Sequence, residues 1–153
     1  MASEDWSLFD SWFEGIKMKT EWEALLAQWR KGAENRELAL HLLFLSWYSC
    51  SEPPYLSGLE GVEIPEFLVD ELFRFLGGEE TQDLEVLYVV TVMVNVAPFC
   101  LGEEQYWKRI GYIFSERLGD VVPDPEIFEG RGSYGEYFAN QARFWRLYPA
   151  SDV

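Results

Sequence analysis

The sequence predicts an all-α protein, folded as a single-domain bundle of about seven helices, with a solenoid-like stack as a variant of that class. Apolar residues recur at the spacing of a helix face, and glycines and prolines separate segments of helical length. The chain has 153 residues, of which 48% are apolar. A chain of this size fits one domain with a substantial core, here residues 1–153.

Two helices are expected before residue 33. The first is predicted by an apolar stripe at Trp6, Phe9, Phe13 and Ile16. The second begins at the capping box of Thr20 and Glu23 and ends at Gly32. Its apolar residues fall at i, i+3, i+4 and i+7, namely Trp22, Leu25, Leu26 and Trp29. These residues predict a helical hairpin at the start of the chain.

A buried central helix and a shorter helix follow, separated by a long loop. Residues 35–50 are rich in Leu and Ala and apolar nearly all round, as in a helix that is covered on most sides. Pro53 and Pro54 end that helix, because a proline has no backbone N–H and disfavours the helical conformation of the residue before it. Pro65 is expected in the first turn of the next helix, whose apolar stripe runs to the glycine pair 77–78.

The run 83–99 is compatible with a helix or a strand. Its valines favour a strand, whereas its length favours a buried helix. We expect a helix, because the flanking segments are helical and a lone strand would have nothing to pair with. A further helix is predicted between Gly102 and Gly119, and a last one after Ser133, which forms a second capping box with Glu136.

The sequence predicts a cytoplasmic protein with no membrane partner. The apolar run 86–101 has 16 residues and contains Thr91, Asn95 and Pro98, whereas a spanning helix needs about 20 mostly apolar residues. The first residues, MASEDWSLFDSW, are acidic where a signal peptide is basic. Cys50 and Cys100 lack metal-ligand spacing and are expected to be buried free thiols, since a disulfide between them would require export.

No motif in the sequence predicts a catalytic residue, a metal or a cofactor. GRGSYG, residues 130–135, matches G-x-G-x-x-G, but VVPDPEIFE precedes it and no lysine follows it, so we expect a flexible entry into the last helix. His41, the single histidine, lies four residues after Glu37, whereas the di-metal motif of helical bundles needs Glu-x-x-His twice. We expect a satisfied histidine at the edge of the buried helix. An unfamiliar enzyme centred on His41 is the least favoured alternative.

The charge distribution is the main indication of function. A net charge of −15 disfavours direct binding to nucleic acids and favours a basic protein partner. Residues 34–80 contain ten acids and two basic residues, so about half of the net charge (10 − 2 = 8 of 15) lies in a third of the chain. Aromatic side chains supply binding energy and carboxylates steer a partner. The stretch contains both carboxylates and aromatic side chains. Its aromatic and apolar residues are Trp47, Tyr48, Tyr55, Leu56 and Phe67.

We therefore predict a docking surface on the loop after Cys50 and on the helix that follows it. The predicted partner-binding residues are Glu52, Tyr55, Leu56, Glu60, Glu63, Glu66 and Asp70. Proline in the loop would lower the entropy lost on binding. In the competing interpretation, Tyr55 and Leu56 cover the end of the core and the acids are a solvated surface.

The passage LLFLSWYSCSEPPYLSGLEG, residues 42–61, resembles a segment of small bacterial proteins in which a buried helix ends in WY, followed by EPP and a Leu-x-Gly-Leu turn. The whole chain, small, acidic and 17% aromatic, is similar in type to immunity proteins that neutralise secreted bacterial toxins. The resemblance implies a tight one-to-one complex that blocks a toxin's active site or substrate groove. We therefore expect a non-enzymatic binding module that inhibits a cognate toxin, with a chaperone or adaptor for a secreted effector as the alternative.

Overall fold

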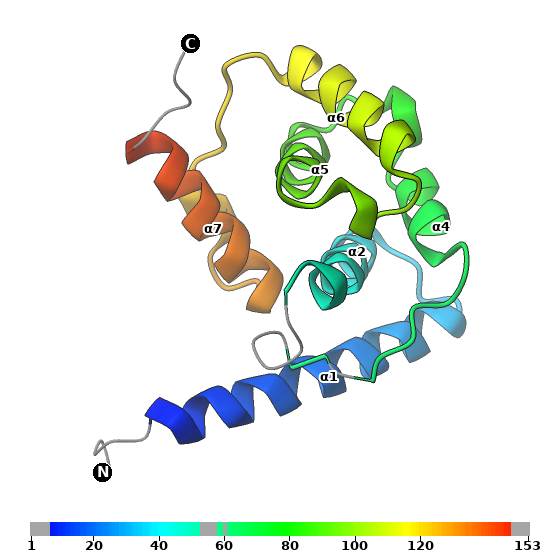
Figure 1. Ribbon diagram of the computed structural model, residues 1–153, viewed down its shortest axis with the longest axis vertical. Coiled ribbons are helices and arrows are strands. Elements are labelled where there is room, and N and C mark those ends of the chain that lie inside the picture. The colour runs from blue at the N-terminus through cyan, green and yellow to red at the C-terminus, as the bar shows by residue number, and fades with distance from the viewer. Residues whose placement is uncertain (1–6, 53–57, 60, 148–153) are drawn as a thin grey trace. The chain divides into compact units, whose positions relative to one another are not determined.

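The computed structural model describes residues 7–52, 58, 59 and 61–147, with side chains described from residue 18 to residue 144 of those ranges (Figure 1). These residues form six α-helices and contain no strand: α1 (Ser7–Arg30), α2 (Arg36–Ser51), α4 (Leu68–Phe75), α5 (Leu84–Val96), α6 (Glu104–Leu118) and α7 (Gly132–Leu147). Three short 3-10 helices accompany them: η1 (Gly78–Glu80), η2 (Pro98–Cys100) and η3 (Pro125–Phe128). The all-α prediction is confirmed.

The chain divides into two compact units, Met1–Leu72 and Phe73–Val153, and the boundary falls within α4. The first of these is unit 1 and the second is unit 2. The prediction of a single domain stays a prediction. Across the residues that the structure describes, no helix combines the length and the apolar character needed to cross a membrane.

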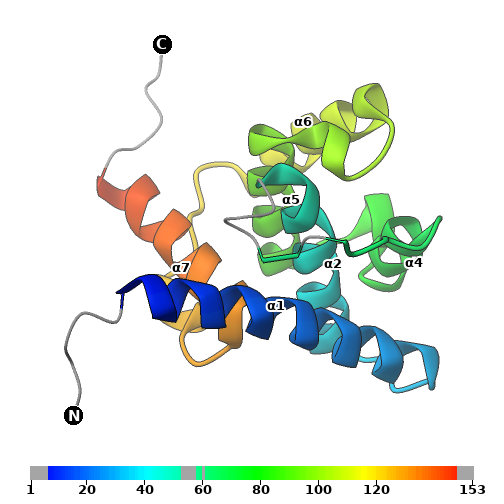
Figure 2. The ribbon, with the colours of Figure 1, turned by 60° about the horizontal axis from the view of Figure 1, so that its bottom comes forward.

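In unit 1, α1 and α2 lie against each other and are joined by a short turn (Figures 1 and 2). Gly32 makes the turn with a φ of 92°, and the Asn35 side chain caps α2 by accepting a hydrogen bond of 2.9 Å from the backbone N–H of Leu38. The Trp22 indole N–H donates to Ser46 Oγ at 3.3 Å. Nearly all of α2 between Leu38 and Trp47 is buried, which confirms the predicted central helix.

The predicted break at Thr20 is wrong, because α1 runs without interruption from Ser7 to Arg30. A Thr-x-x-Glu sequence caps a helix only where the residue before it has left the helical conformation. Nothing in the segment before Thr20 forces that departure, since it contains no proline and ends in Lys, Met and Lys, all good helix formers. The helical hairpin at the start of the chain is therefore made by α1 and α2.

The helix α4 begins three residues after Pro65, so this proline precedes the first turn rather than occupying it. The Pro65 carbonyl accepts from the backbone N–H of Leu68 at 3.1 Å. The Trp29 indole N–H donates to Glu71 Oε2 at 2.7 Å, which fixes the first turn of α4 to the end of α1. The helix ends at the glycine pair as predicted, with a φ of 112° at Gly77.

In unit 2, the valine-rich run is a helix, as predicted. Asp83 caps α5 by accepting hydrogen bonds from the backbone N–H groups of Glu85 and Val86, and every residue from 86 to 94 is buried. The helices α5 and α6 lie side by side (Figures 1 and 2). A Cβ on Gly111 of α6 would come within 2.5 Å of Val94 Cγ1, so the glycine permits this close approach. Burial on all sides thus overrides the local strand preference of valine.

The glycines of GRGSYG pack η3 against α7 in unit 2. Gly130 and Gly132 have φ angles of 74° and 69°, and a Cβ on Gly135 would lie 2.1 Å from the Phe128 carbonyl oxygen. Arg131 forms an ion pair of 2.8 Å with Glu85. The residues therefore lie at the entry into the last helix, as predicted, whereas the flexibility of that entry stays a prediction. The second capping box is wrong, because α7 begins at Gly132 and Ser133 lies inside its first turn.

Candidate protein-binding surface

The predicted partner-binding residues fall into three groups. Glu63, Glu66 and Asp70 are exposed on the segment before α4 and in its first turn. Glu52 follows α2 and is half-buried. Tyr55, Leu56 and Glu60 lie outside the described residues. The structure therefore brings part of the predicted site onto one continuous stretch of unit 1.

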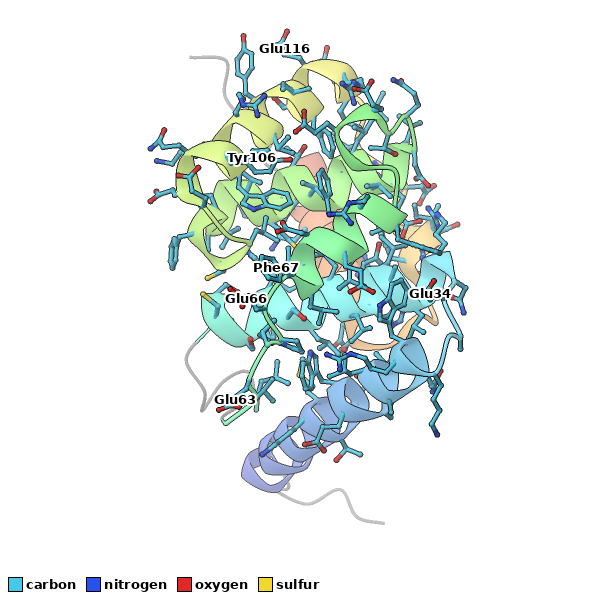
Figure 3. All side chains as sticks on the ribbon, turned by 90° about the vertical axis from the view of Figure 1, so that its right-hand side faces the viewer. Glu34, Glu63, Glu66, Phe67, Tyr106 and Glu116 are labelled. Atoms are coloured by element: carbon cyan, nitrogen blue, oxygen red, sulfur yellow. The ribbon has the colours of Figure 1, made fainter. Side chains whose placement is uncertain are left out.

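Figure 3 shows Glu63, Glu66 and Phe67 along the chain that leads into α4, whereas Glu34 lies at the opposite side of unit 1 in that view. Glu34 was counted in the acidic stretch 34–80, and it is exposed. Nearness in sequence therefore overstated how far these acids gather in space. We call the group of Glu63, Glu66, Phe67 and Asp70 the Phe67 surface.

Phe67 has an unusual combination of exposure and backbone conformation. Its side chain is 70% exposed, and its φ of 69° lies in the left-handed region, where it is the one non-glycine residue of the described chain. Its carbonyl accepts the hydrogen bond of 2.9 Å from the Glu71 N–H that begins α4. The left-handed conformation costs an L-residue about 1–2 kcal/mol. An exposed aromatic ring held at such a cost is more easily explained by a partner than by packing.

The other predicted aromatic residues of this stretch serve the core where the structure describes them. Trp47 is fully buried, and Tyr48 stacks on Phe44 with ring centroids 5.1 Å apart. Of these three described aromatic residues, Trp47 is buried, Tyr48 is half-buried and Phe67 is exposed. The sequence placed all of them at helical or loop positions, and no pattern distinguished the exposed ring from the buried ones.

The carboxylates of the Phe67 surface are free of ion pairs with other described residues. No salt bridge or hydrogen bond joins the side chain of Glu63, Glu66 or Asp70 to any residue in the described ranges, whereas Glu71 is occupied by Trp29. Exposed carboxylates with no internal cation keep their full electrostatic potential for an approaching ligand. The surface can therefore attract and pair with Lys or Arg side chains of a partner.

His41 makes the contact that we expected of a satisfied histidine. Its Nε2 lies 2.9 Å from Glu37 Oε2, one turn earlier on α2, and the Glu37 side chain is 48% exposed. Within the described part of the chain, no three His, Cys, Asp or Glu side chains are arranged to hold a metal ion.

The prediction of buried free thiols is wrong. Cys50 and Cys100 are both disulfide-bonded, and the bond joins one to the other. Cys50 is exposed and Cys100 is half-buried. A disulfide needs the two Cα atoms within about 7 Å, and a separation of 50 positions in the sequence contains no information about that distance. The general preference of free cysteine for the core therefore misled the prediction.

A pocket in unit 2 was missed by sequence reasoning. It has a volume of about 460 Å³ and lies between α5, the end of α6 and residues 119–122. Its lining comes from two separate stretches of sequence, 88–95 and 115–122, and mixes apolar and polar residues. No local motif marks such a site, because only the packing of α5 on α6 brings its walls together.

Comparisons with family models, curated proteins and solved structures find no match. The resemblance to immunity proteins therefore stays a prediction.

Proposed function

We propose that this protein is a non-enzymatic binding module whose Phe67 surface docks a basic partner protein. The observation that carries the proposal is the 70% exposed Phe67 ring, held in a left-handed backbone conformation on the same stretch of chain as the exposed acids Glu63, Glu66 and Asp70. Aromatic anchors supply much of the binding energy at interfaces, and surrounding charges govern the rate and selectivity of encounter.

A basic partner is favoured by the charge of the whole chain. The net charge of −15 raises the local concentration of cations and basic proteins, and it repels nucleic acids and anionic membranes. Within this class we propose an inhibitor of the immunity type, in which the partner is a cognate toxin. This narrower assignment rests on the resemblance in size, acidity and aromatic content, and we propose no cofactor for it.

The disulfide supports a revision of the expected cytoplasmic location. Disulfides persist in oxidising compartments and are reduced in most cytoplasms. We propose that the protein acts in an oxidising compartment. Rapid acid quenching of host cells, followed by maleimide labelling, should leave both cysteines unmodified unless a reductant is added. Labelling of both thiols without a reductant would instead support the cytoplasmic location predicted from the sequence.

The docking proposal is tested with two variants that carry the same change in charge. One variant reverses Glu63, Glu66 and Asp70 to lysine. The control reverses three exposed acids of unit 2, Glu116, Glu126 and Glu136, also to lysine. A basic protein captured from the native host by the wild type should be lost with the first variant and kept by the control.

The kinetics separate a specific surface from bulk attraction. At low salt, the first variant should associate at least roughly tenfold more slowly than the control with the captured partner. Phe67→Asn should instead raise the dissociation rate, because it removes the anchor and leaves the charges. Equal association rates for the two charge variants would show that the Phe67 surface is not the docking site.

The toxin assignment needs a separate measurement. Expression of the captured partner alone should arrest growth, and co-expression of the wild type should restore it while co-expression of Phe67→Asn should restore it less. A harmless partner would exclude a toxin. A complex that withstands high salt would favour the chaperone or adaptor alternative, because apolar contacts are not screened.

A further inference from the structure

The pocket of unit 2 has the size of a small-molecule site and an apolar interior. Its volume of about 460 Å³ falls within the range of roughly 300–1,000 Å³ that such sites occupy. Val92 of α5 and Leu118 of α6 line it and are buried, whereas Val121 lines it and is 46% exposed. Covering such apolar surface with a ligand is favourable. All the lining residues belong to unit 2, so the pocket is separate from the Phe67 surface.

Thr91 and Ser115 line the pocket, and the protons of their hydroxyl groups are already engaged. The Thr91 hydroxyl donates to the Leu87 carbonyl at 2.7 Å, and the Ser115 hydroxyl donates to the Tyr112 carbonyl at 3.0 Å. A hydroxyl group has a single proton, so each oxygen keeps only its capacity to accept. Neither residue therefore favours a ligand whose polar group is only an acceptor.

The charges around the pocket favour a cation. Asp120 lines the pocket and is exposed, and its side chain forms no hydrogen bond or ion pair with a described residue. The stretch 115–126 contains four acids and one basic residue, Arg117. The Arg117 guanidinium is directed to the carbonyls of Glu79 and Thr81, at 2.8 and 2.9 Å. Because no Lys, Arg or His lines the pocket, the Asp120 carboxylate attracts a cation there and repels an anion.

We infer that the pocket binds an amphipathic organic cation, a small molecule with an apolar body and one ammonium group. The apolar body covers Val92, Leu118 and Val121, and the ammonium group lies near the Asp120 carboxylate at the exposed rim. The net charge of −15 raises the local concentration of such a cation. This site is additional to the proposed docking function and uses none of its residues.

The test compares two fluorescent probes that share one apolar body. Dansylcadaverine has a primary ammonium group, N-acetyl-dansylcadaverine has none, and the fluorescence of both shifts to the blue in apolar surroundings. With the intact oxidised protein at low salt, we expect saturable binding of one dansylcadaverine per chain. The acetylated probe should have a dissociation constant that is roughly three- to fivefold higher.

The preference for the charged probe should depend on Asp120. Asp120→Asn removes the charge and keeps the shape, so it should bring the two dissociation constants to within roughly twofold of each other. Glu116→Gln is the matched control, because Glu116 is an exposed acid of α6 that does not line the pocket (Figure 3). This control should keep the preference. Equal preferences in the two variants would overturn the inference.

A second pair of variants tests whether the probe occupies this pocket. Val121→Lys adds a cation and removes an apolar contact, so it should weaken dansylcadaverine binding by at least roughly tenfold. Ile127→Lys is the control, because Ile127 is 45% exposed and does not line the pocket. It should bind as the wild type does, and circular dichroism verifies the helices of every variant. Equal binding by these two variants, or no saturable binding by the wild type, would also overturn the inference.

Discussion

Replacing Phe67 by asparagine should leave the stability of the protein almost unchanged, although a large aromatic side chain is lost. The ring is 70% exposed, so about 30% of its surface is covered (100 − 70). Full burial of a phenylalanine side chain stabilises by up to about 3 kcal/mol, and 30% of that is about 0.9 kcal/mol. Asparagine adopts the left-handed conformation far more readily, which should recover about 1 kcal/mol at a φ of 69°. The two terms nearly cancel.

Phe99→Asn is the matched comparison. Phe99 lies in η2, is 60% exposed and has no positive φ, so its replacement loses about 40% of a full burial and gains nothing from the backbone. We expect a loss of about 1.2 kcal/mol by the same arithmetic. The two variants should therefore differ by about 1 kcal/mol in the free energy of unfolding.

Urea unfolding followed by tryptophan fluorescence measures this difference, with equal slopes required for the comparison. If Phe67→Asn is destabilised as much as Phe99→Asn, the left-handed backbone at residue 67 imposes no cost. The argument that Phe67 is kept for binding at the expense of stability would then fail. A near-neutral Phe67→Asn that also fails to hold the partner would support that reasoning on both counts.

Three further predictions concern stability. Gly135→Ala should lower the free energy of unfolding by more than about 3 kcal/mol, because its Cβ would lie 2.1 Å from the Phe128 carbonyl oxygen. Gly130→Ala should lower it by only about 1 kcal/mol, the cost of a φ of 74°. Equal urea midpoints for the two variants would contradict this. Reduction of the disulfide should lower the free energy of unfolding by about 4 kcal/mol, since it opens a loop of about 50 residues, and a change below about 1 kcal/mol would contradict the estimate. Because burial raises the pKa of Tyr88, the folded state retains a phenol proton that the unfolded chain releases above about pH 10. Stability should fall with rising pH in that range, and less steeply in Tyr88→Phe; parallel pH profiles would contradict this.

Two helix boundaries in unit 2 were predictable from local chemistry, although the valines inside α5 favour a strand locally. The cap at Asp83 and the stop at Gly119 have local chemical causes that are visible in the sequence. Thr20 failed as a boundary because a capping motif needs a preceding break in the backbone, and the sequence contains none there. A capping motif therefore predicted a helix boundary only where the neighbouring backbone also leaves the helical conformation.

The candidate site was less predictable than the fold. The acids at Glu63, Glu66 and Asp70 are exposed as expected, since charged side chains are rarely buried without a partner. No pattern in the sequence indicated the exposure of Phe67 or its left-handed backbone conformation. The pocket beside Tyr88 depends on how two helices pack, and the disulfide depends on a distance in space.

The valine-rich helix α5 has a consequence for how the protein behaves once it unfolds. Its sequence, LEVLYVVTVMVNV, has one charged residue, no proline and a strong local preference for extended structure. Burial in the packed interior and the Asp83 cap keep it helical, so an opened chain would expose a segment suited to intermolecular β-pairing. Heating should then end in aggregates, with an apparent melting temperature that depends on the scan rate. The lifetime of the protein at high temperature would be set by how fast this segment becomes exposed.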